Sequence, residues 1–367
     1  MAPISPMRLA ITGLGLVSTI GYDVVSACAS LRAGITRPSP LDFYVASSEN
    51  LSVEAVMGHP MTGVTDGFAG LGLYVHLASL ALQDLLTYGR LDATDTRFWR
   101  DTALWVGTSH PRVAEAEDGE ALQRLLGARL CAELVRREGL AISPDHQRLV
   151  PQGHTSVLSA VAKAAEALAH GRVRRALVLG VDSLVGEDEL QWLAFHRRLK
   201  TPERPVGLMP GEAAAALLLE SEAEARRRQA VPAGFVTAVE VLEPPREIRD
   251  EPPGLLLAHA IEATAAQAPR IHTIYGDLNG EEWRARQWGT ALVRFSQHPP
   301  FQGVRQSWPA TSLGDTGAAS GAIHLALACR TFLRNPASGD TALVWSQADS
   351  GAVASALVRR ANVNTNT

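Results

Sequence analysis

RRALVLGVDS at residues 174–183 and GEAAAALLLE at residues 211–220 predict two buried strands, because each is a short apolar run next to charged residues or glycine. Near the C-terminus the chain repeats both runs, as DTALVWSQADS at residues 340–350 and GAVASALVRR at residues 351–360. A helix-forming segment rich in small residues precedes each pair, at residues 153–171 and 314–333. We therefore predict an α/β protein with two similar halves, residues 1–230 and 231–367, packed into one layered unit.

The same reading predicts further elements on both sides of these runs. RLAITGLGLV at residues 8–17 has the pattern of a buried strand that ends in a glycine turn, and residues 102–108 and 271–275 have strand patterns too. Apolar residues at helical spacing predict helices over residues 22–33, 70–88, 113–138, 255–267 and 283–295. Helices and strands thus alternate along both halves.

The composition excludes several classes of protein. Of 367 residues, 46% are apolar and 20% are charged, which is typical of a globular chain and not of a disordered or collagen-like one. The formal charge of −4 gives no reason to expect nucleic acid or an anionic membrane as a partner. We expect a cytoplasmic protein, because the chain has only three cysteines, no leader-like N-terminus and no long apolar segment. We expect no metal, because no group of residues has the spacing of metal ligands.

Four stretches carry a resemblance to a known family. ITGLGLVS at residues 11–18, the small-residue helix followed by ALVLGVDS, GEAAAALLLE, and SLGDTGAASGAI at residues 312–323 stand in the same order as motifs of the β-ketoacyl synthases. The sequence resembles that family, which implies a thiolase-like duplicated five-layer αβαβα fold. It also implies a dimer formed through a strand near residues 149–152. GLGLVS partly matches the dinucleotide fingerprint, but Ser18 stands where the third glycine belongs, and we expect no cofactor.

The resemblance implies that the family's catalytic residues have been replaced. β-Ketoacyl synthases use a cysteine and two histidines, and the matching positions here hold His154, Asn279 and Gly314. A register shifted by two residues would place Gln152 at the cysteine position. Neither register supplies a thiol, since the cysteines stand elsewhere, at positions 28, 131 and 329. We therefore expect a degenerate member that lacks the Cys-His-His triad and has lost condensing activity.

Two functions remain open on this reading. The first is a pseudoenzyme: a non-catalytic binding, partner or accessory protein, like a chain-length factor or an adaptor, in a homodimer or in a heterodimer with a ketosynthase-like chain. The second is an acyl-thioester enzyme (a 3-oxoacyl synthase, acyltransferase or hydrolase) rebuilt around His154, which we expect to be neutral at a helix N-terminus. Its other pocket residues would be Gln152, Asp277, Glu281, Asp315 and Ser350. Asp and Asn in such turns also serve as ordinary turn residues.

The two functions predict different geometries. An enzyme should hold His154 within about 3 Å of a carboxylate beside a substrate-sized cavity, whereas a binding protein can have a filled pocket. The basic cluster Arg197, Arg198, Lys200 and Arg204 is predicted to be a solvated loop. In the family, such a cluster often contacts an acyl carrier protein, which is the alternative.

Overall fold

The computed structural model describes residues 8–46, 53–112, 116–244, 253–295 and 298–361. In these residues ten strands form one mixed sheet, in the order β10-β9-β11-β12-β8-β1-β7-β6-β4-β5. The first half supplies β1 (Leu9–Ser18), β4 (Thr102–Gly107), β5 (Gln147–Val150), β6 (Arg175–Ser183) and β7 (Glu212–Ser221). The second half supplies β8 (Gly234–Leu242), β9 (Thr273–Tyr275), β10 (Arg305–Ser307), β11 (Thr341–Gln347) and β12 (Val353–Arg360).

The two halves of the sheet have the same topology. β5, β4, β6, β7 and β1 follow one another as β10, β9, β11, β12 and β8 do. In both sets the first three strands are parallel and the last two pairings are antiparallel. The repeated sequence runs therefore occupy equivalent strands, β6 with β11 and β7 with β12. The two halves join where β1 pairs with β8, and the boundary at residue 230 stays a prediction.

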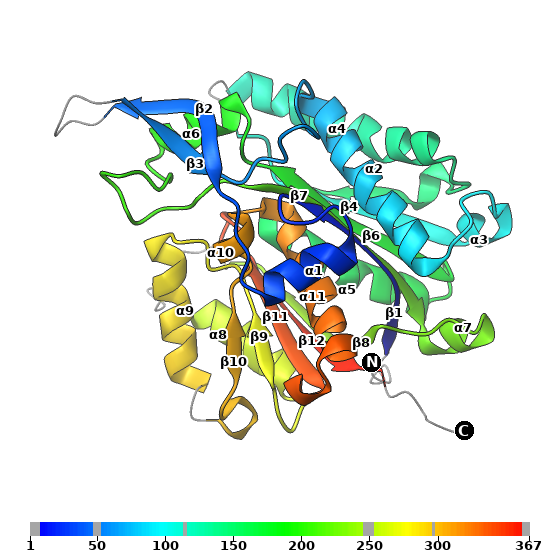
Figure 1. Cartoon of the computed structure of the whole chain (residues 1–367). Helices are drawn as coiled ribbons and strands as arrows, with labels where there is room; N and C mark the ends of the chain where they lie inside the picture. The colour runs from blue at the N-terminus through cyan, green and yellow to red at the C-terminus, as the bar shows by residue number, and fades with distance from the viewer. Residues whose placement is uncertain (1–7, 47–52, 113–115, 245–252, 296–297, 362–367) are drawn as a thin grey trace.

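Helices α5 (Ser156–Ala169) and α11 (Ser320–Arg334) lie between the two halves of the sheet and contact strands of both (Figure 1). Outside the first half lie α2 (Gly70–Gly89) and α4 (Ala116–Glu138), and outside the second half lie α8 (Leu255–Ala265) and α9 (Glu282–Phe295). Strand β6 shows why these strands are apolar throughout. Ala176 and Val178 pack into the central helical layer, whereas Leu177 and Leu179 pack against α2 and α4. The arrangement is five layers, αβαβα.

The remaining elements lie around these layers. They are α1 (Val24–Arg32), α3 (Thr96–Arg100), α6 (Glu187–Phe195), α7 (Glu222–Arg227), α10 (Ala310–Leu313) and a hairpin of β2 (Ser39–Ala46) and β3 (Val53–Gly58). Helix α1 begins at Asp23, whose carboxylate accepts hydrogen bonds from Val25 N and Ser26 N. Within the described ranges, no helix combines the length and the apolar content that a membrane crossing requires.

Both central helices begin at the same end of the sheet. A short 3₁₀ turn precedes each one, η2 (Gly153–Thr155) before α5 and η4 (Gly317–Ala319) before α11, and the two turns contact each other. Gly180 of β6 allows this approach, because a Cβ there would lie 2.4 Å from the carbonyl oxygen of Ala318. Residues 277–281, which follow β9, reach the same place. Three loops from both halves therefore meet at one point.

Candidate functional site

The meeting point of the three loops is a buried hydrogen-bonded cluster. His154, 2% exposed, lies in η2, and its Nε2 is 2.7 Å from Oδ1 of Asp315. The other carboxylate oxygen of Asp315 accepts a hydrogen bond of 2.7 Å from Nδ2 of Asn279. Gly314, directly before Asp315, has a φ of +69° that an L side chain would rarely adopt. The three positions singled out from the sequence thus lie together, because His154 and Asn279 both bind Asp315, the residue that follows Gly314.

Arg284 of α9 also belongs to this cluster. Its side chain is fully buried, and its Nη2 lies 3.2 Å from Nδ1 of His154 and 3.2 Å from Oδ1 of Asp349. Its Nη1 donates to the carbonyl oxygen of Gln347, at 2.5 Å, and its Nε lies 3.4 Å from Glu281. The sequence analysis missed Arg284. A signal was present, because Arg284 falls on the same helical face as the apolar residues Trp288, Ala291 and Phe295.

A second arginine closes the cluster toward the surface. Arg198 binds Glu281 through two hydrogen bonds of 2.6 and 2.8 Å, and it binds Asp349 at 2.7 and 3.1 Å. Arg112 adds a contact of 3.2 Å to Asp349. The loop after α6 is therefore fastened to the loops that follow β9 and β11. The prediction of a solvated basic loop is wrong for Arg198, whose side chain is only 15% exposed.

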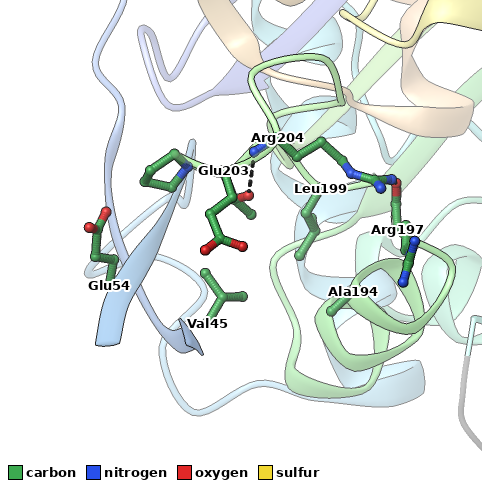
Figure 2. Close-up of a pocket in the computed structure, with 9 residues that line it drawn as sticks. Val45, Glu54, Ala194, Arg197, Leu199, Glu203 and Arg204 are labelled. Carbon is green, nitrogen blue, oxygen red and sulfur yellow. Dashed lines mark hydrogen bonds between the residues drawn. The ribbon is translucent and has the colours of Figure 1, made fainter. Parts of the chain in front are cut away.

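Two other basic residues of that cluster line a separate pocket. Arg197 and Arg204 line a pocket of ≈ 470 Å³ between the β2–β3 hairpin and the loop after α6 (Figure 2). Glu54 and Glu203 belong to the same lining, so charges of both signs face this pocket. None of its lining residues belongs to the His154 cluster. Of the basic cluster, Arg198 is thus bound into the His154 cluster, Arg197 and Arg204 line this pocket, and Lys200 is exposed.

Comparisons with known proteins give the fold. No protein-family model matches the sequence, and no curated protein matches it. A type II polyketide synthase ketosynthase, solved in complex with its acyl-carrier protein and bound to the hexaketide, matches with a TM-score of 0.77 at 15% identity, covering 97% of this chain and 100% of that chain. The ishigamide ketosynthase/chain length factor matches with a TM-score of 0.74 at 20% identity, covering 97% of this chain and 100% of that chain. The ketosynthase from module 6 of the bacillaene synthase of Bacillus subtilis 168 matches with a TM-score of 0.75 at 14% identity, covering 96% of this chain and 72% of that chain.

The chain has the ketosynthase fold. This confirms the predicted thiolase-like, duplicated α/β architecture, which the sequence resemblance implied. The assignment of His154, Asn279 and Gly314 to the family's cysteine and histidine positions stays a prediction, as does the role of every pocket residue. What the structure adds is the contacts that these residues make within a ketosynthase fold.

The hydrogen bonds of His154 determine its protonation. Burial lowers the pKa of His154, but the charges of Asp315 and Asp277 and the hydrogen bond to Asp315 raise it above its ordinary value. The guanidinium of Arg284 can only donate, however, so a proton on Nδ1 would face another N–H at 3.2 Å. Both contacts are hydrogen bonds only in the neutral tautomer in which Nε2–H donates to Asp315 and Nδ1 accepts from Arg284. The raised pKa runs against the neutral ring expected from the helix N-terminus, because the carboxylates outweigh burial and Arg284.

Asp315 is a buried carboxylate that several donors of the cluster hold. Burial raises its pKa, but the neighbouring His154 and Arg284 and the hydrogen bonds from His154 and Asn279 together hold the pKa of Asp315 well below its usual range. The backbone N–H of Gly317 adds a hydrogen bond of 2.8 Å. A carboxylate with this many donors is held in its charged form.

The other predicted pocket residues lie around this cluster but do not all join it. Asp277 is buried and accepts a hydrogen bond of 2.9 Å from the backbone N–H of Gln347, with His324 at 3.8 Å. Glu281 is an ion-pair partner of Arg198. Gln152 and Ser350 line a cleft of ≈ 290 Å³ that also reaches His154. The wall of this cleft further includes Ser109, His110, Arg112, Trp192, Glu243 and Asp349.

No cysteine belongs to the site. Burial raises the pKa of Cys28 and of Cys131 to about 12, and it raises that of Cys329 further. All three are buried and stand in α1, α4 and α11. A thiol with so high a pKa is almost entirely protonated at neutral pH, so none of the three offers a thiolate nucleophile.

Proposed function

We propose that this chain is a ketosynthase-like protein that has lost condensing activity and acts by binding, as a partner or accessory protein. One observation carries the proposal: each side chain that occupies a predicted catalytic position is already bound to another protein group. Both ring nitrogens of His154 have partners. Asn279 donates to Asp315 and Glu281, and Gly314 has no side chain. A general base or nucleophile needs a lone pair that it can offer to substrate.

The charges around these residues support the same proposal. Condensation on a thioester needs donors directed at the developing negative charge. Here the arginines of the cluster, Arg284, Arg198 and Arg112, are paired with Glu281 and Asp349. A carboxylate that is paired with an arginine offsets the positive charge of the guanidinium, so the arginine attracts an oxyanion less strongly. The cluster resembles a structural core more than a prepared anion site.

The solved structures of the same fold suggest what kind of partner to seek. One of them is a ketosynthase/chain length factor, and another is a ketosynthase with its acyl-carrier protein. In this chain β5 forms one edge of the sheet and leads into η2 and His154. We propose that this edge pairs with a second copy or with a ketosynthase-like chain, at the strand near residues 149–152.

A second candidate is an acyl-thioester enzyme with a rebuilt site. One observation favours it: His154 lies 2.7 Å from a carboxylate, and it is one of the residues that line a cleft of ≈ 290 Å³. For catalysis, however, the ring would have to release Arg284 or Asp315 first. The 2% exposure of His154 leaves it little access to the cleft as it stands.

Thiol release separates the two candidates. The purified chain is incubated with malonyl and medium-chain acyl thioesters, on coenzyme A and on an acyl carrier protein, and free thiol is measured with a chromogenic reagent. The matched variant is His154→Ala. We expect no release above that of His154→Ala. Release that the wild type shows and His154→Ala lacks would overturn the binding proposal and establish an enzyme built on His154.

A further inference from the structure

Three arginine side chains from separate parts of the chain meet at the carboxylate of Asp349. Arg112 follows β4, Arg198 lies in the loop after α6, and Arg284 stands in α9. Arg198 makes two contacts, with Nη1 2.7 Å from Oδ2 of Asp349 and Nη2 3.1 Å from Oδ1. Nη2 of Arg112 lies 3.2 Å from Oδ2, and Nη2 of Arg284 lies 3.2 Å from Oδ1. Each carboxylate oxygen therefore accepts hydrogen bonds from two guanidinium groups.

This arrangement has the geometry of a carboxylate-binding site. A guanidinium group recognises a carboxylate best through two parallel hydrogen bonds, and Arg198 supplies such a pair. Burial raises the pKa of Asp349, but the hydrogen bonds from Arg198 and the charges of Arg284 and Arg112 hold it below its usual range. The site is thus filled by an ionised carboxylate, which the chain itself supplies.

Asp349 is carried by the loop between β11 and β12, residues 348–352. It is an exposed residue, and 34% of its side-chain surface is open to solvent. The N–H of Ala348 donates to the carbonyl oxygen of Ala352 at 2.8 Å, and the N–H of Gly351 donates to that of Ala348 at 3.0 Å. Neither of these two backbone hydrogen bonds involves Asp349. Its side chain can therefore leave the arginines while the loop stays closed at its base.

Two of the three arginines have a second anchor that does not depend on Asp349. Arg198 binds Glu281 through hydrogen bonds of 2.6 and 2.8 Å. Arg284 donates to the carbonyl oxygen of Gln347 at 2.5 Å. Because these partners stay in place, the site should keep its shape when one carboxylate replaces another.

A cleft leads to this site from the surface. Arg112, Asp349 and Ser350 line the same cleft as His154. Its volume of ≈ 290 Å³ is close to the lower end of the range for small-ligand sites, about 300–1,000 Å³. The cleft therefore has room for a small carboxylic acid next to the position that Asp349 occupies.

We propose that the three arginines form a binding site for the carboxylate group of a small molecule, and that Asp349 fills this site until the ligand replaces it. The exchange swaps one carboxylate for another, so the charge of the cluster stays the same. The paired arginines described above are the filled state of this site. Nη2 of Arg284 contacts both Asp349 and Nδ1 of His154, so the ligand would bind beside the partner of that histidine. The site does not depend on whether the chain acts by binding or by catalysis.

Titration of Asp349→Ala and of the wild type with sodium acetate, at an ionic strength kept constant with sodium chloride, tests the site. Binding is measured from the NMR line width of the acetate methyl group. We expect saturable binding to Asp349→Ala, and about 10- to 100-fold weaker binding to the wild type, which corresponds to a state without Asp349 in the site of about 1–10%. Asp349→Ala should fold, because the residue is exposed in a loop, and Asp349→Ser replaces it if circular dichroism shows a loss of structure.

Four results would overturn the proposal. The absence of acetate binding to the variant would refute the site, and equal binding to variant and wild type would place the acetate elsewhere. A wild type that binds no acetate, even at about a hundredfold the dissociation constant of the variant, would make Asp349 a permanent ion-pair partner. Inorganic phosphate binding more tightly than acetate would refute the carboxylate assignment.

Two further variants localise the binding. Asp101→Ala makes the same charge change, but Asp101 pairs with Arg174 at 3.2 Å where both side chains are about half exposed, and it should bind acetate no better than the wild type. Arg112→Gln, added to Asp349→Ala, should weaken acetate binding about tenfold, because one charged donor is lost. Equal binding by Asp101→Ala and Asp349→Ala would mean diffuse attraction to the surface and would refute the site.

Discussion

Arg284→Met removes the guanidinium at the centre of the His154 cluster while keeping a side chain of similar length. Glu281 and Asp349 keep Arg198 as a partner after this change. The carbonyl oxygen of Gln347 and Nδ1 of His154 each lose the contact that Arg284 makes to them. An orphaned buried polar group costs about 1–3 kcal/mol, and this change leaves two of them. We therefore expect the free energy of unfolding to fall by about 2–6 kcal/mol.

Urea unfolding, followed by circular dichroism, measures this loss. Arg286→Met is the matched control, because Arg286 stands on the same helix and is paired with Glu282, but both side chains are mostly exposed. An exposed pair of this kind contributes about 0–1 kcal/mol, so the control should unfold at nearly the wild-type urea concentration. Equal losses in the two variants would refute a structural role for the buried cluster. A gain in stability for Arg284→Met would indicate instead that the cluster stores strain for a catalytic purpose.

Two further predictions concern the charge of the cluster and the thiols. Asp315→Asn should lose about 3 kcal/mol of unfolding free energy at pH 7, because an amide cannot accept hydrogen bonds at both former oxygens. The pKa of Asp315 is lowered in the folded chain, so the stability difference between wild type and variant should shrink as the pH falls below about 4. Urea unfolding at pH 7, 5 and 3.5 would show this. A gap that stays constant to pH 3.5 would mean that Asp315 is not held charged. Under native conditions, a thiol reagent at pH 8 should label none of the three cysteines, and in 8 M urea, a concentration of the order used to unfold proteins, it should label all three. Rapid labelling of the folded chain would contradict their burial.

Much of the fold could be predicted from the sequence, because its central strands carry their own signal. β6, β7, β11 and β12 are buried on both faces, so each reads as a continuous apolar run, and the repetition of these runs predicts the duplication. β8, β10 and the β2–β3 hairpin were missed. β10 has three residues, all at least partly exposed, and exists through its pairing with β9. Such a strand depends on its neighbour, and no local pattern predicts it.

The loops that meet at the candidate site could be named from the sequence, but the contacts between their side chains could not be predicted. The resemblance placed His154, Asn279 and the residues around Gly314 in loops that do meet. The partners of these residues could not be predicted, because Arg284 comes from α9 and Arg198 from the loop after α6. Which carboxylate an arginine binds depends on how distant segments pack. A turn-forming sequence such as residues 277–281 is compatible with a catalytic loop and with a structural one.

The same contacts make the two candidate functions respond in opposite ways to one change. If the chain is an enzyme built on His154, Arg284 inhibits it, because the guanidinium occupies the lone pair of Nδ1 that a base would use. Arg284→Met would then free that nitrogen, and thiol release should rise above the wild-type rate. If the chain acts by binding, the freed nitrogen has no substrate beside it, and the variant should lose stability without gaining any release. Measuring thiol release with Arg284→Met therefore tests the binding proposal under the condition most favourable to its rival.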